Sequence, residues 1–305
     1  MSKIFLRFLK DAFDIREGAF LRVLLMQLNI FLIISTLLII TPTVNGLFLS
    51  ELGVEKLPHA FVLVAIFAVA ISYLYNRFLG QVALNRILLS TLIGSVSLFL
   101  VFGVLLQLQV VFGWVLYAFY VCTAIFAVLT ASQFWILANM VFNSREAKRL
   151  FGLIGAGAIA GGIFGGYLTT ILAEVIGSEN LIFVGAAQLV LCVPITIYIW
   201  NNYVVSTQSR FQRRKKIARS DYPLQIIRKS PHLSSLAGII GVSVIVAKFV
   251  DYQFSAIASA RIPDPDELTA FFGFWFSNQN VISLIIQLLL TRRIVGTLGV
   301  GTSLF

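Results

Sequence analysis

Apolar stretches long enough to cross a lipid bilayer recur along the whole sequence. A helix needs about 20 apolar residues to span the hydrocarbon core. Because lipid offers no hydrogen bonds to the backbone, such stretches must be helical. Of the 305 residues, 59% are hydrophobic and 12% are charged, which is outside the range of soluble domains. We therefore predict an all-α polytopic membrane protein with eight spans, at residues 21–49, 59–79, 87–107, 110–142, 150–173, 180–200, 236–258 and 269–290.

The 23 Lys and Arg residues are distributed unevenly between the two sides of these spans. If the N-terminus is cytoplasmic, 20 of them lie in cytoplasmic segments, while Lys56 and Arg261 lie outside and Lys248 lies within a span. This bias follows the positive-inside rule and predicts a cytoplasmic N-terminus. The basic run at 210–219 then reads as a topogenic loop rather than a site for RNA or anionic lipid, so we expect no nucleic-acid partner.

The spacing of the spans divides the chain into four predicted segments. Residues 1–19 place apolar side chains on one face and predict an interfacial amphipathic helix. Residues 20–200 hold six spans, 201–232 form a basic cytoplasmic linker, and 233–305 start a second bundle with two spans and part of a third. The last apolar run, 294–305, is too short to cross unaided, so the chain is expected to stop inside a ninth helix. This is a major facilitator-like layout with an incomplete second bundle.

Glycines are concentrated in the fifth span. Gly157, Gly161 and Gly165 recur every four residues, a pattern that lets a second helix approach closely. The same span contains Gly155-x-Gly157-x-x-Ala160, which formally matches a dinucleotide fingerprint. That fingerprint requires a preceding strand, and none is predicted here. We therefore interpret the glycines as a helix-packing surface.

Two residues, Pro42 and Gly46, are predicted to interrupt the outer part of the first span. Broken helices expose backbone polar groups and border the binding sites of many transporters. A simple proline kink explains the same residues equally well.

The strongest candidate site is the pair Lys248 and Asp251, deep within the seventh span. Ionisable groups inside a membrane are costly, and they usually pair, face an aqueous cavity and mark a pathway. At i, i+3 the two heads lie on one helix face. A purely structural salt bridge remains an alternative. Five further polar residues are candidate hydrogen-bonding partners for a ligand, with a hydrogen bond between helices as the alternative for each: Gln27, Asn29, Asn278, Gln279 and Asn280.

Covalent chemistry has little support in the sequence. We find no metal-ligand spacing, no pairing of a nucleophile with a base and no paired carboxylates within the spans. Cys122 and Cys192 both fall inside spans, so no disulfide framework is indicated. The chain is therefore not expected to be an enzyme or to carry a metal or cofactor.

Several segments resemble the ATP/ADP translocases of plastids and intracellular bacteria, and more closely the relatives of these proteins in free-living bacteria. The similarity lies in residues 134–139 (FWILAN), 145–155 (REAKRLFGLIG) with the glycine-rich helix, 47–58 (LFLSELGVEKLP), 251–254 (DYQF), 268–273 (LTAFFG) and 287–291 (QLLLT). The resemblance implies a major facilitator-like nucleotide exchanger with twelve helices in complete members. One departure is notable. Where relatives carry charged residues at the end of the first span, this chain has Thr41, Val44 and Asn45.

Taken together, these features predict a secondary transporter of the bacterial inner membrane that moves an organic anion by alternating access. The resemblance suggests ATP and ADP as candidate substrates, and the transport unit is expected to be a monomer in the lipid bilayer. Lys248 would neutralise substrate charge, and Asp251 would set or share the proton of that lysine. The alternative is a non-transporting membrane anchor or sensor module for cytoplasmic domains that are missing from this chain.

Overall fold

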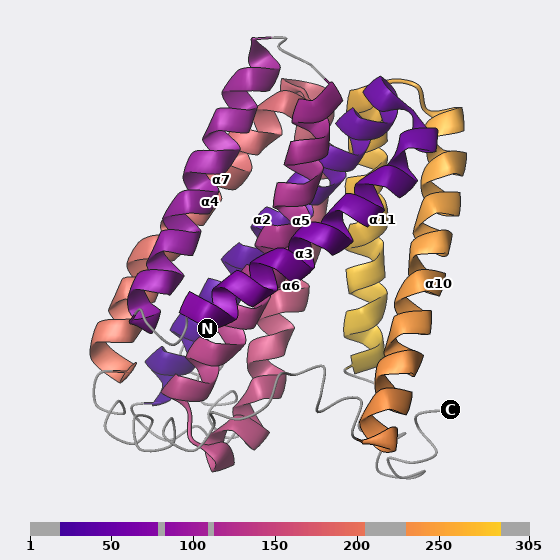
Figure 1. Cartoon of the computed structure of the whole chain (residues 1–305). Helices are drawn as coiled ribbons and strands as arrows, with labels where there is room; N and C mark the ends of the chain where they lie inside the picture. The colour runs from indigo at the N-terminus through magenta and orange to yellow at the C-terminus, as the bar shows by residue number, and fades with distance from the viewer. Residues whose placement is uncertain (1–18, 79–82, 109–112, 205–229, 288–305) are drawn as a thin grey trace.

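The computed structural model describes residues 19–78, 83–108, 113–204 and 230–287, and long helices dominate them (Figure 1). The predicted all-α architecture is confirmed in these residues. The eight long helices are α2 (Ala19–Leu52), α3 (Leu57–Phe78), α4 (Leu84–Gln107), α5 (Gly113–Val141), α6 (Ser144–Ile176), α7 (Ser178–Ile199), α10 (Pro231–Arg261) and α11 (Pro265–Ile285). Two short elements, η1 (Val54–Lys56) and the π-helical η2 (Trp200–Val204), complete the described chain.

Within the described residues, seven helices are long and apolar enough to cross a membrane. The helix α11 is not among them, because the polar run at 277–280 lowers its mean hydropathy. All but the last residue of the predicted amphipathic helix at 1–19, most of the linker at 201–232 and the apolar run at 294–305 lie outside the described residues. The division into two bundles therefore stays a prediction.

Consecutive helices run in alternating directions, so their connections fall at two opposite ends (Figure 1). We call the end with the α2–α3 and α10–α11 connections the upper end, and the opposite one the lower end. The helix α2 is central: it packs against α5, α6, α7 and α11. The helix α4 lies on α7, and α3 lies on α5. By contrast, α10 contacts η1, α2 and α3, stacks Phe254 on the Phe271 and Trp275 rings of α11, and exposes most of its length.

One glycine face of α6 lies against α2. A Cβ atom added to any of three glycines would collide with the α2 backbone or with atoms next to it. At Gly161, for example, the carbonyl carbon and Cα of Phe31 would both lie 3.0 Å from the added atom. The facing pairs are Gly157 with Gln27, Gly161 with Phe31 and Gly165 with Ser35. Both partners advance by four residues, so glycine at this spacing allows backbone-to-backbone contact along the interface.

A second glycine face of the same helix lies against α11. An added Cβ at Gly162 would reach the side chain of Asn280, and one at Gly166 would lie 2.6 Å from the carbonyl oxygen of Gly273. The Ser277 hydroxyl donates a hydrogen bond of 2.8 Å to the carbonyl of Ile163. The helix α6 is therefore held between α2 and α11, and it joins the first six helices to the last one described.

Neither Pro42 nor Gly46 breaks the first span. The helix α2 continues through both residues from Ala19 to Leu52, so the broken-helix interpretation is wrong for this structure. The structure gives Gly46 a different role, because an added Cβ there would collide with the Thr269 hydroxyl of α11. Gly46 thus permits close approach of α2 and α11 near the upper end.

A carboxylate of α11 caps another helix at the upper end. The carboxylate of Asp266 accepts a 2.7 Å hydrogen bond from the backbone N–H of Ser178, the first residue of α7. The Ser178 hydroxyl in turn lies 3.4 Å from the carbonyl oxygen of Pro265 and donates to it. Unpaired N–H groups at a helix N-terminus favour a negative charge. Asp266 therefore ties α11 to α7 at this end.

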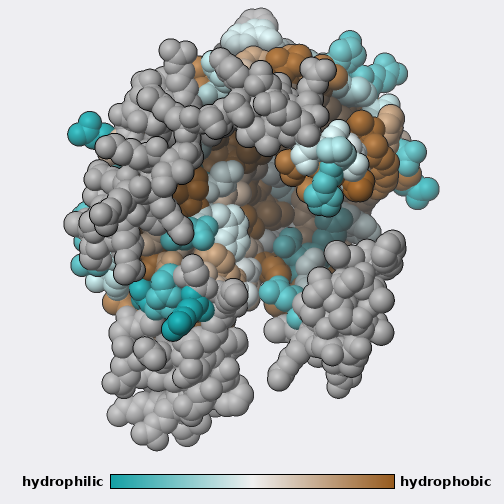
Figure 2. Space-filling model, turned by 60° about the horizontal axis from the view of Figure 1, so that its bottom comes forward, coloured by the Kyte–Doolittle hydropathy of each residue, from teal (hydrophilic) through white to brown (hydrophobic). Residues whose placement is uncertain are grey.

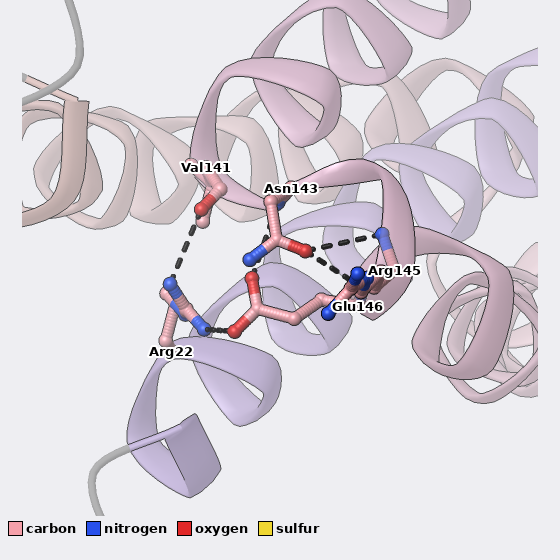
Figure 3. Close-up of polar contacts among 5 residues, drawn as sticks. All are labelled: Arg22, Val141, Asn143, Arg145 and Glu146. Atoms are coloured by element: carbon pink, nitrogen blue, oxygen red, sulfur yellow. Dashed lines mark hydrogen bonds and ion pairs between the residues drawn. The ribbon is translucent and has the colours of Figure 1, made fainter.

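At the lower end, an arginine of α2 is joined to the connection between α5 and α6 (Figure 3). The Arg22 guanidinium donates to the Glu146 carboxylate at 2.6 Å and to the Val141 carbonyl at 3.2 Å. The other carboxylate oxygen of Glu146 accepts from the backbone N–H of Asn143, whose side chain caps the start of α6. One glutamate thus completes a capping box and an ion pair at the same time.

Candidate functional site

Lys248 and Asp251 form the predicted ion pair near the middle of α10. The Lys248 Nζ lies 2.8 Å from Asp251 Oδ2. The other described Lys and Arg residues lie near helix ends or in connections. The side chain of Lys248 is 51% exposed and that of Asp251 is 34% exposed. An ammonium group has three donors, so the pair leaves Lys248 able to bind a further acceptor.

An aromatic wall from the first six helices lies opposite this pair. The Lys248 ammonium is 4.7 Å from the centre of the Phe61 ring of α3, within the range of a cation–π contact. The centre of the Phe61 ring lies 6.4 Å from that of the Tyr120 ring on α5, and the centre of the Tyr120 ring lies 5.3 Å from that of Phe48 on α2. We define the aromatic wall as Phe48, Phe61, Tyr117 and Tyr120.

The lower end of the molecule is hollowed between the helices. Figure 2 brings the lower end forward and shows a recess in the middle of that face, with both hydrophilic and hydrophobic residues on its walls. A recess of mixed polarity between helices is the usual setting for small-molecule sites in helical bundles.

The two polar residues predicted from the first span point in different directions. Asn29 is buried and donates a 2.9 Å hydrogen bond to the Thr196 hydroxyl of α7. It lines a small internal cavity of about 10 Å³ together with Thr130 and Gln133. Gln27 instead faces α6 at Gly157. The structure therefore places Asn29 inside the first six helices, away from the contacts of Lys248.

The three polar residues of α11 differ in their engagement. The Asn278 side chain donates to its own helix at Phe274 and accepts from the Tyr167 hydroxyl of α6 at 3.3 Å. Asn280 donates to the carbonyl of Phe276 and lies against Gly162. Gln279 is exposed. The contacts of Asn278 and Asn280 hold α11 on α6, and none of the three residues touches Lys248 or Asp251.

Phe61 and Tyr120 were not among the residues predicted from the sequence. Both are aromatic residues within apolar helices, and nothing in their spacing separates them from ordinary core residues. Only the packing of α3 and α5 opposite α10 reveals them. The Arg22–Glu146 pair was also not predicted, because Arg22 entered only the charge bias and Glu146 only the segment at 145–155 that carries the family resemblance.

Comparison with known proteins gives a consistent result. The family model described as the TLC ATP/ADP transporter matches residues 106–303, more than half of the chain. The match includes the glycine-rich helix α6, the Lys248–Asp251 pair and α11. No solved structure gives a significant match.

Individual relatives are carrier proteins of bacteria and plastids. The chain is 26% identical over 206 residues to "ADP,ATP carrier protein 1" of Chlamydia muridarum, which covers 61% of this chain and 39% of the relative. It is 26% identical over 209 residues to "ADP,ATP carrier protein 1, chloroplastic" of Arabidopsis thaliana, covering 62% and 32%. The aligned region thus spans about two fifths or less of these relatives. Because the family model extends over most of the described helices, the chain belongs to the TLC ATP/ADP transporter family.

Proposed function

We propose that the protein is a secondary transporter that exchanges an organic anion, most simply a nucleotide, by alternating access. The observation that carries this proposal is the accessible ammonium of Lys248 near the middle of a membrane helix. Family membership supports ATP and ADP as the substrates to test. Relatives with carrier names from bacteria and plastids support the same choice.

Charge arguments favour Lys248 as the contact for the substrate anion. A phosphate group entering a low-dielectric site needs a cationic partner. The first span offers none at Thr41, Val44 or Asn45. Among the described residues, Lys248 is the cation placed away from both helix ends. Asp251 holds that ammonium in the absence of substrate, so that neither charge is left alone in the membrane.

The remaining predicted contacts can be ranked by their freedom to bind. The side chain of Gln279 is exposed and that of Gln27 is partly exposed. Asn29, Asn278 and Asn280 are already engaged in contacts between or within helices. We therefore propose Gln27 and Gln279 as the hydrogen-bonding partners to test first.

The location and orientation belong to the same proposal. We propose that the protein lies in a bacterial inner membrane as a monomeric transport unit, with its N-terminus and lower end in the cytoplasm. The basic residues Arg22, Arg86 and Arg145 at the lower end support this orientation. Acidic residues such as Glu51, Asp264 and Glu267 lie at the opposite end.

Transport in proteoliposomes tests the proposal directly. Vesicles that contain the protein and are loaded with ADP should take up labelled ATP faster than vesicles without internal ADP. Lys248→Gln should reduce this uptake at least tenfold, because it removes the cationic contact. Lys56→Gln, a change to an exposed lysine in a connection, is the matched control and should leave uptake unchanged.

Two results would count against specific parts of the proposal. Absence of ATP uptake by the wild-type protein would exclude nucleotide exchange and favour a non-transporting membrane module. Normal uptake by Lys248→Gln would remove the role given to that lysine and leave the transport function intact.

A further inference from the structure

The aromatic wall opposite Lys248 is built from three helices and is firmly supported. Phe48 of α2 is fully buried, and the Tyr117 ring packs edge-on against it at 5.1 Å. The Tyr117 hydroxyl donates to the carbonyl of Lys56 in η1, which fixes that ring. In front of this layer lie Phe61 and Tyr120, both only partly buried. The planes of these two rings are tilted by 50° to each other, so a flat ligand ring can stack on one of them and meet the other at an angle.

The present partners of Lys248 leave part of its ammonium free for another acceptor. Asp251 belongs to the same helix and takes one donor, and the Phe61 ring covers another side of the ammonium. The Lys248 ammonium and the Asp251 carboxylate both remain accessible, as the exposed fractions of their side chains show. An incoming anion with several acceptor oxygens can draw the ammonium away from the Phe61 ring, because a charge-assisted hydrogen bond is worth more than an exposed cation–π contact.

This exchange of partners leaves an aromatic surface open beside the bound anion. Once Lys248 moves off Phe61, the face of that ring no longer contacts a cation. Another flat apolar ring can then stack on this face. A ligand with an anionic group and a planar ring satisfies both elements at once. An aliphatic anion would satisfy only Lys248.

We propose that Phe61 and Tyr120 form a platform for the planar ring of the substrate, a nucleobase or similar heterocycle, next to the anion contact at Lys248. This inference rests on the function proposed above and adds the determinant of ring specificity. Base stacking on aromatic side chains tolerates differences between bases, since every base has a π-face. The platform therefore selects for an aromatic ring rather than for one particular base.

Equilibrium binding of two anions to the purified full chain separates the platform from the charge contact. The probes are ATP and inorganic triphosphate, which share the phosphate chain but differ in the base. Phe61→Leu should weaken ATP binding about tenfold, the effect expected when one stacking ring is lost. The same change should leave triphosphate binding within about twofold of wild type, because its contact is Lys248. Lys248→Gln should weaken both.

Two further variants guard against a trivial loss of structure. Phe61→Tyr keeps the ring and should bind ATP like wild type. Phe67→Leu alters an exposed phenylalanine of the same helix and should change neither affinity. A role of Phe61 in structure alone predicts equal losses for ATP and triphosphate.

The outcomes distinguish this inference from the proposed function. Equal losses of both ligands in Phe61→Leu, or no loss of ATP binding, would overturn the platform. Equal affinity of the wild-type protein for ATP and triphosphate would also overturn it, and the anion contact would stand. Failure of the wild-type protein to bind either anion would overturn the proposed function, and the platform with it.

Discussion

Replacing Gly161 with alanine gives the sharpest test of how the helices are held together. The added Cβ would collide with the Phe31 carbonyl oxygen and lie 3.0 Å from two backbone carbons of α2. Backbone atoms cannot move aside as a flexible side chain can, so the two helices must separate. A gap of about 0.5–1 Å loses a quarter to a half of the dispersion attraction between the atoms concerned.

The expected cost follows from two opposing terms. Overpacking a close interface typically costs about 1–3 kcal/mol. Alanine also favours the helix over glycine by about 0.5–1 kcal/mol, which offsets part of this cost. We therefore expect Gly161→Ala to lower the free energy of unfolding by about 1–2 kcal/mol.

The same helix provides a matched control at Gly155. An added Cβ there meets nothing within 4 Å, so only the helix-propensity term applies. Gly155→Ala should be neutral or stabilise the protein by up to about 1 kcal/mol. Unfolding by sodium dodecyl sulfate in mixed micelles, followed by circular dichroism, measures both changes. If Gly161→Ala proved as stable as Gly155→Ala, close backbone contact between α2 and α6 would be refuted.

The Arg22–Glu146 ion pair and the Asp266 cap of α7 can each be tested by substitution. Glu146→Gln keeps an acceptor for the capping box but removes the charge paired with Arg22, so the free energy of unfolding should fall by about 1 kcal/mol. The same detergent titration should show no change for Arg145→Gln, the control. If Glu146→Gln lost the same stability at high salt, an ionic cause would be contradicted. Asp266→Ala removes the acceptor for the Ser178 amide and should cost about 1 kcal/mol, whereas Asp266→Asn keeps an acceptor and should cost less. Hydrogen exchange at the Ser178 amide checks this, and unchanged protection in Asp266→Ala would contradict the capping role.

Much of the fold follows from hydropathy and the length of the apolar runs. Each predicted span overlaps a described helix, and seven of these helices are long and apolar enough to cross a membrane, because a chain in lipid has few alternatives to helical hydrogen bonding. The helix ends are less predictable. The helix α6 begins at Ser144 rather than at residue 150, since the Asn143 cap and Glu146 extend it through a charged segment. Hydropathy alone treats that segment as a loop.

The candidate site was only partly predictable. The spacing of Lys248 and Asp251 is enough to place both heads on one face of a helix, and the structure pairs them. Gln27 and Asn29 are two residues apart, a spacing that puts side chains on different helix faces. Helix geometry therefore explains why Asn29 of α2 bonds to Thr196 of α7 while Gln27 of α2 faces Gly157 of α6. Phe61 and Tyr120 required the tertiary packing, because no local signal distinguishes them.

The contacts of α11 constrain any movement between the first six helices and the last two described. At the upper end, Asp266 caps α7 and Thr269 lies against Gly46 of α2. At the lower end of α6, an added Cβ at Gly152 or Gly155 would meet no neighbour. Alternating access that opens the upper end must therefore break the Asp266 cap and separate Gly46 from Thr269. The interface between α6 and α11 must also give way, because Tyr167 of α6 donates to Asn278 and Thr170 of α6 donates to the Ala270 carbonyl.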